Sequence, residues 1–370
     1  MSLRSRRPLR SSAGVSVSDG GVTLGKVPIA VVGATGYAGL EACRLVLGHP
    51  ALELTIATSR SQAGTPLGQV YPHLAHATDI VLSPPDPERI AQVPFALVAL
   101  PSRESMTLVP ALLERGVRVI DLSADFRLRD EATYQRHYGV AHAAPQWLLR
   151  AVYGLPERHR AEVPGAALIA NPGCYPTAAI LALAPALAAG LISRRGLIID
   201  AYSGVSGAGR EPSRETSLAE LAGNLSPYNL AGGHRHSPEM EQELSGAAGG
   251  EVTLTFSPHR APQSRGILAT CYGSLVGEVT AAQALEVYRE AYRQEKFVTV
   301  MSDALPSTKA VGGTNMAQVA VRVDRHAGWL VAIAAIDNLG KGAAGQAVQN
   351  LNIMSGRPEA EGLPRIALWP

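Results

Sequence analysis

Short runs of apolar residues alternate with helical patterns in the first part of the chain. The runs contain almost no polar positions, which is typical of strands buried on both faces of a parallel sheet. Between them, residues 40–47 and 104–115 space their apolar side chains as helices do. This alternation predicts a doubly wound, Rossmann-like α/β domain over residues 28–172. The predicted strands are residues 28–32, 52–58, 95–100 and 117–122.

The pattern changes after this region. A strongly apolar helix is predicted at residues 178–191, and one further clear helix at 281–293. Most of the remaining apolar segments are short and read as strands, which predicts an α+β domain over residues 173–339 with a largely antiparallel sheet. A last helix at 343–354 is expected to pack back on the first domain, so residues 340–370 are assigned to it. The predicted strands are residues 197–202, 252–256, 267–275, 316–323 and 329–336.

Composition narrows the class of protein. The 370 residues are 46% hydrophobic and 17% charged, enough to bury two cores. The net charge of +2 gives no electrostatic reason to expect a nucleic-acid or membrane partner. No apolar run approaches the roughly 20 residues needed to cross a bilayer. The three cysteines are widely spaced and form no disulfide framework, so a reducing cytoplasm is the expected location.

Residues 1–27 differ from the rest of the chain. They are rich in arginine and serine and contain no apolar core, so we do not expect a secretory signal. We predict a disordered or tag-like extension, with a transit peptide as the alternative.

A glycine-rich turn joins the first predicted strand to the first helix. Its glycines allow a tight bend and let backbone N–H groups approach a pyrophosphate at the helix N-terminus. The second strand ends in Ser59-Arg60 rather than in a carboxylate, and an arginine beside a hydroxyl suits the 2′-phosphate of NADP. We therefore predict an NADP site, while a solvated role for Arg60 is the alternative. The predicted cofactor-binding residues of the turn are Gly33, Thr35, Gly36, Tyr37, Ala38 and Gly39.

Cys174 lies in the run 171–177, between a predicted strand and a long apolar helix. A thiolate at a helix N-terminus is stabilised by the helix dipole and by free N–H groups, and the same donors can hold an oxyanion. Cys174 is therefore the candidate nucleophile. Cys43 and Cys271 fall within predicted apolar elements and are expected to be structural.

A cysteine nucleophile needs an acid or base partner. The densest polar group in the chain is residues 232–239, which contains His234 and His236 before a predicted helix. Two histidines at this spacing are also able to bind a metal, with His259 as a third ligand, and this alternative stays open. No carboxylate or cysteine stands at a convincing ligand spacing, so the predicted site contains no metal.

Taken together, six segments resemble the N-acetyl-γ-glutamyl-phosphate reductase family, which is related to the aspartate-semialdehyde dehydrogenases. The resemblance extends from residue 28 to about residue 370 and keeps the order of the family's motifs. The segments are residues 33–39, 121–128, 171–177, 203–210, 232–239 and 337–347.

The resemblance implies NADPH-dependent reduction of N-acetyl-γ-glutamyl phosphate to N-acetylglutamate 5-semialdehyde, with release of phosphate, in arginine biosynthesis. Cys174 would form a thioester, His236 would act as acid and base, and Asn338 would lie near the nicotinamide. It also implies a homo-oligomer, dimeric or tetrameric, with residues 173–339 carrying catalysis and oligomerisation. The residues it implies for the small-molecule substrate are Arg210, Tyr228, His234, Arg235 and Arg265.

Two alternatives remain at this point. A homologous reductase of lysine or arginine synthesis acts on an acyl phosphate bound to a carrier protein. An NADP-binding regulator without catalysis would share the glycine-rich turn but would not need an activated thiol.

Overall fold

The computed structural model describes residues 25–369, and its first sheet contains six strands in the order β2-β1-β3-β4-β6-β5. Every neighbouring pair in this sheet is parallel, which confirms the predicted doubly wound architecture. The short strand β5 was not predicted, because two residues are too few to show a pattern. The strands are β1 (Val27–Val32), β2 (Leu52–Thr58), β3 (Phe95–Val98), β4 (Arg118–Asp121), β5 (Val152–Tyr153) and β6 (Leu168–Ala170).

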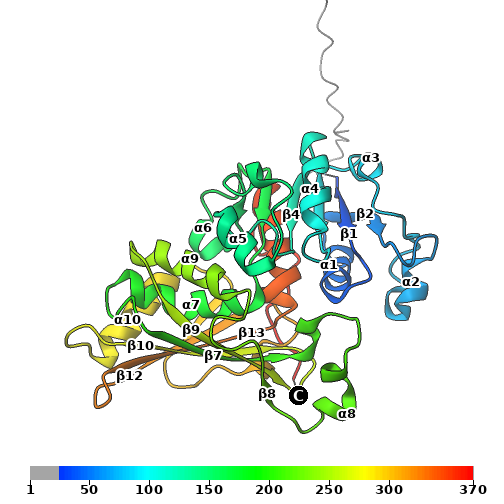
Figure 1. The fold of residues 1–370 in the computed structure, drawn as a ribbon. Coiled ribbons are helices and arrows are strands. Elements are labelled where there is room, and N and C mark those ends of the chain that lie inside the picture. Colours follow the sequence, from blue (N-terminus) through cyan, green and yellow to red (C-terminus); the bar gives the residue numbers. More distant parts are fainter. Residues whose placement is uncertain (1–24, 370) are drawn as a thin grey trace, which may run out of the picture.

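Helices cover both faces of this sheet. They include α1 (Tyr37–Leu47), α4 (Ser105–Glu114) and α11 (Gly345–Met354). Ile29 and Val31 of β1 point into a core shared with α1 and α11, whereas Ala30 and Val32 point into a second core shared with α4. Because side chains alternate along a strand, β1 is apolar at every one of these positions. The helix α11 lies between the two halves of the molecule (Figure 1, orange to red).

The second sheet has seven strands in the order β11-β12-β13-β10-β7-β9-β8. The pairs β7/β9 and β11/β12 are parallel and the other four are antiparallel, so the sheet is mixed with an antiparallel majority. The short strands β8 and β11 were not predicted. The strands are β7 (Leu197–Gly204), β8 (Ser226–Pro227), β9 (Leu254–Ala261), β10 (Ile267–Ser274), β11 (Val298–Met301), β12 (Ala317–Asp324) and β13 (Trp329–Ile336).

The helix α7 (Cys174–Ala188) packs against the second sheet with α9 (Ser237–Ala248) and α10 (Ala281–Tyr292). Its residues from Tyr175 to Leu187 are all buried, which explains why its sequence is apolar without a polar face. It begins earlier than the predicted residue 178, since the first turn of a helix tolerates Pro176.

Short helical turns complete the described chain. We did not predict them: except for α5, which has eight mostly polar residues, each has only three to five residues, too few to show a helical period. They are α2 (Leu67–Val70), α3 (Pro87–Ile90), α5 (Glu131–Tyr138), α6 (Pro156–His159), α8 (Leu218–Leu221), η1 (Pro72–Leu74), η2 (Pro145–Trp147), η3 (Val205–Ala208), η4 (Arg214–Thr216), η5 (Thr308–Val311) and the π-helix η6 (Gly340–Ala344).

The chain passes between the two sheets through residues 171–173, which follow β6, and through residues 337–339, which follow β13. Cys174 and Asn338 lie at these two passages, so the two domains meet at the predicted site. Of the predicted extension, residues 1–24 lie outside the described residues. Within residues 25–369, no helix has the length and apolar character needed to cross a membrane.

Candidate active site

Two adjoining cavities lie at the meeting of the domains, with volumes of about 900 Å³ and 790 Å³. The larger, the glycine-loop cavity, is lined by residues 33 and 35–38 of the glycine-rich turn. The smaller, the arginine cavity, is lined by four arginines: Arg103, Arg127, Arg235 and Arg260. Cys174 and His236 line both, so the candidate nucleophile and its partner lie where the cavities meet.

The glycine-rich turn has the geometry that a dinucleotide site requires. Gly33 has a φ of +80°, and a Cβ added at Gly39 would lie 2.1 Å from the Gly33 carbonyl oxygen. Only glycine allows this close return of the chain, which brings the N-terminus of α1 to the cavity wall. A Cβ at Gly36 would meet nothing nearer than 3.8 Å, so space remains beside the first turn of the helix. The turn therefore fits a pyrophosphate.

The end of β2 carries no carboxylate. Ser59 Oγ lies 2.9 Å from Thr35 Oγ1, which joins the end of this strand to the glycine-rich turn. Arg60 lines the same cavity with 63% of its side chain exposed, and its Nη1 lies 2.7 Å from Glu104 Oε2. An arginine at this position can reach an anionic group at the outer end of the cavity once it leaves Glu104.

Cys174 is the first residue of α7 and is the one cysteine of the described chain that lines a cavity; Cys43 and Cys271 are fully buried. Burial raises the pKa of Cys174 to about 11, although Arg127 and the backbone N–H of Tyr175 act in the opposite direction. The resting thiol is therefore protonated at neutral pH, and attack requires a group that accepts its proton.

His236 precedes the first turn of α9 and faces the Cys174 turn. A Cβ built on Gly173 would lie 2.7 Å from His236 Nε2, so a side chain here would displace the imidazole. Burial holds the pKa of His236 well below its usual value, and the neighbouring His234 adds to this effect. The imidazole is neutral and able to accept a proton. Its Nδ1 is buried and has no hydrogen-bond partner among residues 25–369.

Two buried charged residues near this pair were not predicted. Glu239 Oε1 accepts hydrogen bonds from Gly173 N and Tyr153 Oη, both at 2.8 Å. Arg127 Nη1 lies 3.4 Å from Glu239 Oε2, while its Nε and Nη2 donate to backbone carbonyls. Both residues belong to segments that carried the family resemblance, which was the available signal. Together they fix the turn before Cys174 from two sides.

The arginine cavity contains three of the five residues predicted for the substrate: Tyr228, His234 and Arg235. Burial lowers the pKa of His234 to about 4, so its ring is neutral. Arg260, which we did not predict, lies with its guanidinium carbon 4.3 Å from the centre of the Tyr228 ring.

Arg103, also unpredicted, lies in the arginine cavity with a φ of +78°. Its backbone N–H donates to both carboxylate oxygens of Asp125, at 2.8 and 2.9 Å. These bonds hold the backbone of Arg103 in a left-handed conformation that residues other than glycine seldom adopt. No pattern in the sequence marked this position.

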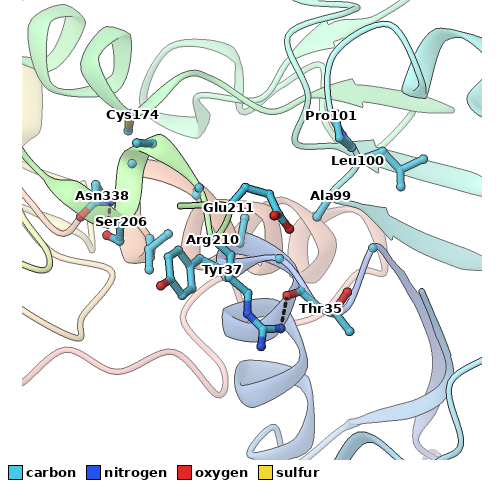
Figure 2. Close-up of a pocket in the computed structure, with 18 of the residues that line it drawn as sticks. Thr35, Tyr37, Ala99, Leu100, Pro101, Cys174, Ser206, Arg210, Glu211 and Asn338 are labelled. Atoms are coloured by element: carbon cyan, nitrogen blue, oxygen red, sulfur yellow. Dashed lines mark hydrogen bonds between the residues drawn. The ribbon is translucent and has the colours of Figure 1, made fainter. Parts of the chain in front are cut away.

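The other two predicted substrate residues lie elsewhere. Arg210 lines the glycine-loop cavity and donates to the Thr35 carbonyl at 3.1 Å (Figure 2). It also donates to Tyr71 Oη at 2.9 Å. Within the described chain, Arg265 lines neither cavity and instead bonds two carboxylates. Only one of the three predicted arginines therefore faces the arginine cavity, because the loops that carry the others fold towards α1.

Asn338 lies in the wall of the glycine-loop cavity, on the same side as Cys174 and Ser206 (Figure 2). Its Oδ1 accepts from Gly266 N at 2.7 Å and its Nδ2 donates to Ser206 Oγ at 2.9 Å. The side chain is thus fixed at the inner end of this cavity, near the thiol.

The histidines do not form a metal site. His259 stacks on Tyr202 with ring centres 4.6 Å apart, whereas His234 packs against His236, Tyr228 and Phe256. Residues 25–369 contain no cluster of three or more histidine, cysteine or acidic side chains able to hold a metal ion.

Comparison with known proteins agrees with this geometry. Residues 28–166 match the family model "Semialdehyde dehydrogenase, NAD binding domain", and residues 174–338 match "Semialdehyde dehydrogenase, dimerisation domain". Aspartate semialdehyde dehydrogenase II from Vibrio cholerae has the same fold, with a TM-score of 0.69 and 20% identity over 90% of this chain and 98% of that one. The fold is that of the semialdehyde dehydrogenases, and the two domains match the two family models of this class.

Closer relatives define the family within this class. N-acetyl-gamma-glutamyl-phosphate reductase from Dehalococcoides mccartyi is 49% identical over 93% of this chain and 99% of its own length. The enzyme of that name from Symbiobacterium thermophilum is 46% identical over 91% and 97%. The chain belongs to the N-acetyl-γ-glutamyl-phosphate reductase family of oxidoreductases.

Proposed function

We propose that the protein reduces N-acetyl-γ-glutamyl phosphate to N-acetylglutamate 5-semialdehyde with NADPH, releasing phosphate, as a step of arginine biosynthesis. The observation that carries this proposal is the position of Cys174, at the junction of a dinucleotide-type cavity and a cavity lined by arginines. The names of the relatives supply the substrate, since the cavity alone defines only a small anionic acyl compound.

The first chemical step belongs to Cys174 and His236. The sulfur attacks the γ-acyl carbon while His236 Nε2 accepts the thiol proton, because both groups are neutral at rest. The N-terminus of α7 offers backbone N–H groups to the negative carbonyl oxygen. The bond to phosphate then breaks, the departing phosphate takes up a proton from solvent, and a thioester is left on Cys174.

The arginine cavity is suited to the two anionic ends of the substrate. Arg103, Arg235 and Arg260 lie in its wall and can bind the α-carboxylate and the phosphate through charge-assisted hydrogen bonds. Tyr228 and His234 are neutral and complete the wall. Arg127 is held by two backbone carbonyls and by Glu239, and it contributes positive charge beside the thiol.

The glycine-loop cavity would hold NADPH, which when bound supplies a hydride to the acyl carbon. The turn at residues 33–39 would cradle the pyrophosphate, and Ser59 and Arg60 would bind the 2′-phosphate. Asn338 would position the nicotinamide end. When the aldehyde leaves, the proton on His236 Nε2 returns to the sulfur and restores the resting pair.

The alternatives have less support. The relatives carry the name of the reductase for the free substrate, which argues against the carrier-bound acyl phosphate and against a regulator without catalysis. We further propose that the protein is a cytoplasmic homo-oligomer, in keeping with its free cysteines and with the family model for residues 174–338.

The test is oxidation of NADPH in the presence of N-acetylglutamyl phosphate, or formation of NADPH from the semialdehyde, phosphate and NADP. We expect turnover with the free substrate that exceeds turnover with a carrier-bound acyl phosphate. A preference for the carrier-bound compound, or binding of NADPH without turnover of either, would overturn the proposal.

A further inference from the structure

Arg265 bridges two carboxylates that belong to different domains. Its Nε and Nη2 donate to Asp337 at 2.9 and 3.0 Å, and its Nη2 and Nη1 donate to Glu41 at 3.0 and 3.3 Å. The side chain of Asp337 is fully buried and that of Glu41 is 6% exposed, whereas Arg265 is 31% exposed. The guanidinium therefore closes the interface from its outer edge.

Each carboxylate belongs to an element that shapes the glycine-loop cavity. Glu41 lies in α1, one turn after the glycine-rich turn from which the helix begins. Asp337 follows β13, and besides Arg265 it accepts the backbone N–H groups of Leu339, Gly340 and Gly313 at 2.6 to 2.9 Å. Asp337 thus organises the turn that leads into the π-helix η6.

This turn lies directly against the reacting groups. A Cβ built on Gly342 in η6 would lie 2.9 Å from the Cβ of Cys174. Asn338 follows Asp337, and its side chain is held by the backbone N–H of Gly266, the residue after Arg265. The position of Arg265 therefore fixes the Asn338 turn through both its own side chain and the backbone of the next residue, Gly266.

The balance of charge shows what loss of Arg265 would do. Burial by itself would raise the pKa of Glu41, but hydrogen bonds from Arg44 and Arg265 reverse this and lower it. Arg44 bonds Glu41 at 2.7 Å from within the same helix, so it neutralises Glu41 without contacting the second domain. Without Arg265, Asp337 would lose its one ion-pair partner in the described chain and would be left as a buried, uncompensated charge.

We propose that Arg265 is a positioning residue that clamps helix α1 to the Asp337–Asn338 turn and so sets the distance between the bound cofactor and Cys174. The role in hydride transfer rests on the proposed function, whereas the clamp itself does not. Arg265 acts through Glu41 and Asp337 and lines neither of the two cavities. A displacement of about 1 Å between reacting groups is enough to lower a rate by about 100-fold.

The experiment compares Arg265→Ala with Arg44→Ala in the full-length protein. Both variants remove a cation from Glu41, but only the first breaks the connection between the domains. We expect hydride transfer in a single turnover to fall at least about 30-fold in Arg265→Ala and less than about threefold in Arg44→Ala. The primary isotope effect with NADPH deuterated at the transferred position should rise in the first variant alone. Alkylation of Cys174 by iodoacetamide should stay within about twofold of wild type in both.

Two further measurements keep the test decisive. Guanidinium ion at low millimolar concentration should restore part of the hydride-transfer rate of Arg265→Ala, while the same concentration of potassium should not. Arg265→Lys and Glu41→Gln are milder variants for use if Arg265→Ala does not fold, and their losses should be intermediate. Equal losses in Arg265→Ala and Arg44→Ala, or a loss of alkylation that parallels the loss of hydride transfer, would overturn the proposal.

Hydrogen–deuterium exchange separates this proposal from the proposed function. Exchange at residues 337–344 should be faster in Arg265→Ala than in wild type or Arg44→Ala, with no substrate present. If the wild-type protein does not reduce the acyl phosphate but the exchange result holds, the clamp stands and the substrate is wrong. Unchanged exchange would refute the clamp whatever the substrate.

Discussion

The two cavities that meet at Cys174 share part of their lining but differ in the groups that each offers to a ligand. In the glycine-loop cavity the glycine-rich turn contributes backbone and small side chains, and Asn338 lies at the inner end. The arginine cavity takes its four arginines, at residues 103, 127, 235 and 260, from four separate segments. Backbone N–H groups suit a pyrophosphate that many proteins share, whereas side chains select one substrate. Variants on the two sides should therefore change different kinetic constants.

Substitution of Cys174, which lines both cavities, should have the largest effect on activity. We expect Cys174→Ser to lose activity by roughly 10⁴-fold or more, because a serine hydroxyl is a far weaker nucleophile in the same place. NADPH affinity, measured by fluorescence titration, should change less than about twofold. Trapping with radiolabelled substrate should detect the thioester in wild type but not in the variant. Full activity of Cys174→Ser would refute the proposed mechanism.

His236→Ala should lower kcat by about 10²- to 10⁴-fold, the usual contribution of a positioned acid or base. The ionisation of the Cys174 thiol determines how the loss of kcat in His236→Ala changes with pH. Because burial raises the pKa of Cys174 to about 11, a rising pH deprotonates more of the thiol without help from a base. The loss in the variant should therefore shrink between pH 7 and pH 9.

The control for His236→Ala is NADP affinity, which should stay close to wild type since the ring does not belong to the glycine-rich turn. A loss that stays constant with pH would show that His236 does not accept the thiol proton. A large loss of NADP affinity would show instead that His236 takes part in binding the cofactor.

Arg260→Ala tests the arginine cavity by itself. A charge-assisted hydrogen bond contributes about 1.5–3 kcal/mol, so we expect the KM for the acyl phosphate to rise about 10- to 100-fold. The KM for NADPH should not change, because Arg260 lies outside the glycine-loop cavity. Arg195→Ala, at an exposed position of the second domain, serves as the matched control. Equal increases in both Michaelis constants would remove the distinction between the two cavities.

Arg60→Ala should have the smallest effect of these substitutions. Unlike Arg260→Ala, it should affect the cofactor and not the acyl phosphate. Its side chain is 63% exposed, so we expect about a tenfold narrowing of the preference for NADPH over NADH and no change in the KM for the acyl phosphate. Steady-state kinetics with both cofactors measures it. An unchanged cofactor preference would leave Arg60 as the partner of Glu104 alone.

The sequence predicted the parts of the molecule that depend on local pattern. Apolar runs defined the strands of the first sheet, and the run at residues 33–39 defined the turn, because a tight turn requires glycine at fixed positions in the chain. Cys174 could be predicted because it is the first residue of a helix. The short strands β5, β8 and β11 and the short helical turns were missed, since they are formed by pairing and packing rather than by a period.

The sequence by itself determined the two domains, the dinucleotide turn and the thiol, because each depends on neighbours in the chain. Tertiary structure decided the rest. It placed Arg103 and Arg260 in the arginine cavity, Arg210 on the glycine-rich turn, and Arg265 between Glu41 and Asp337. Arginines are alike in sequence, and their roles are set by which carboxylate, carbonyl or cavity lies within reach of a long side chain. That reach becomes defined only once the two domains meet.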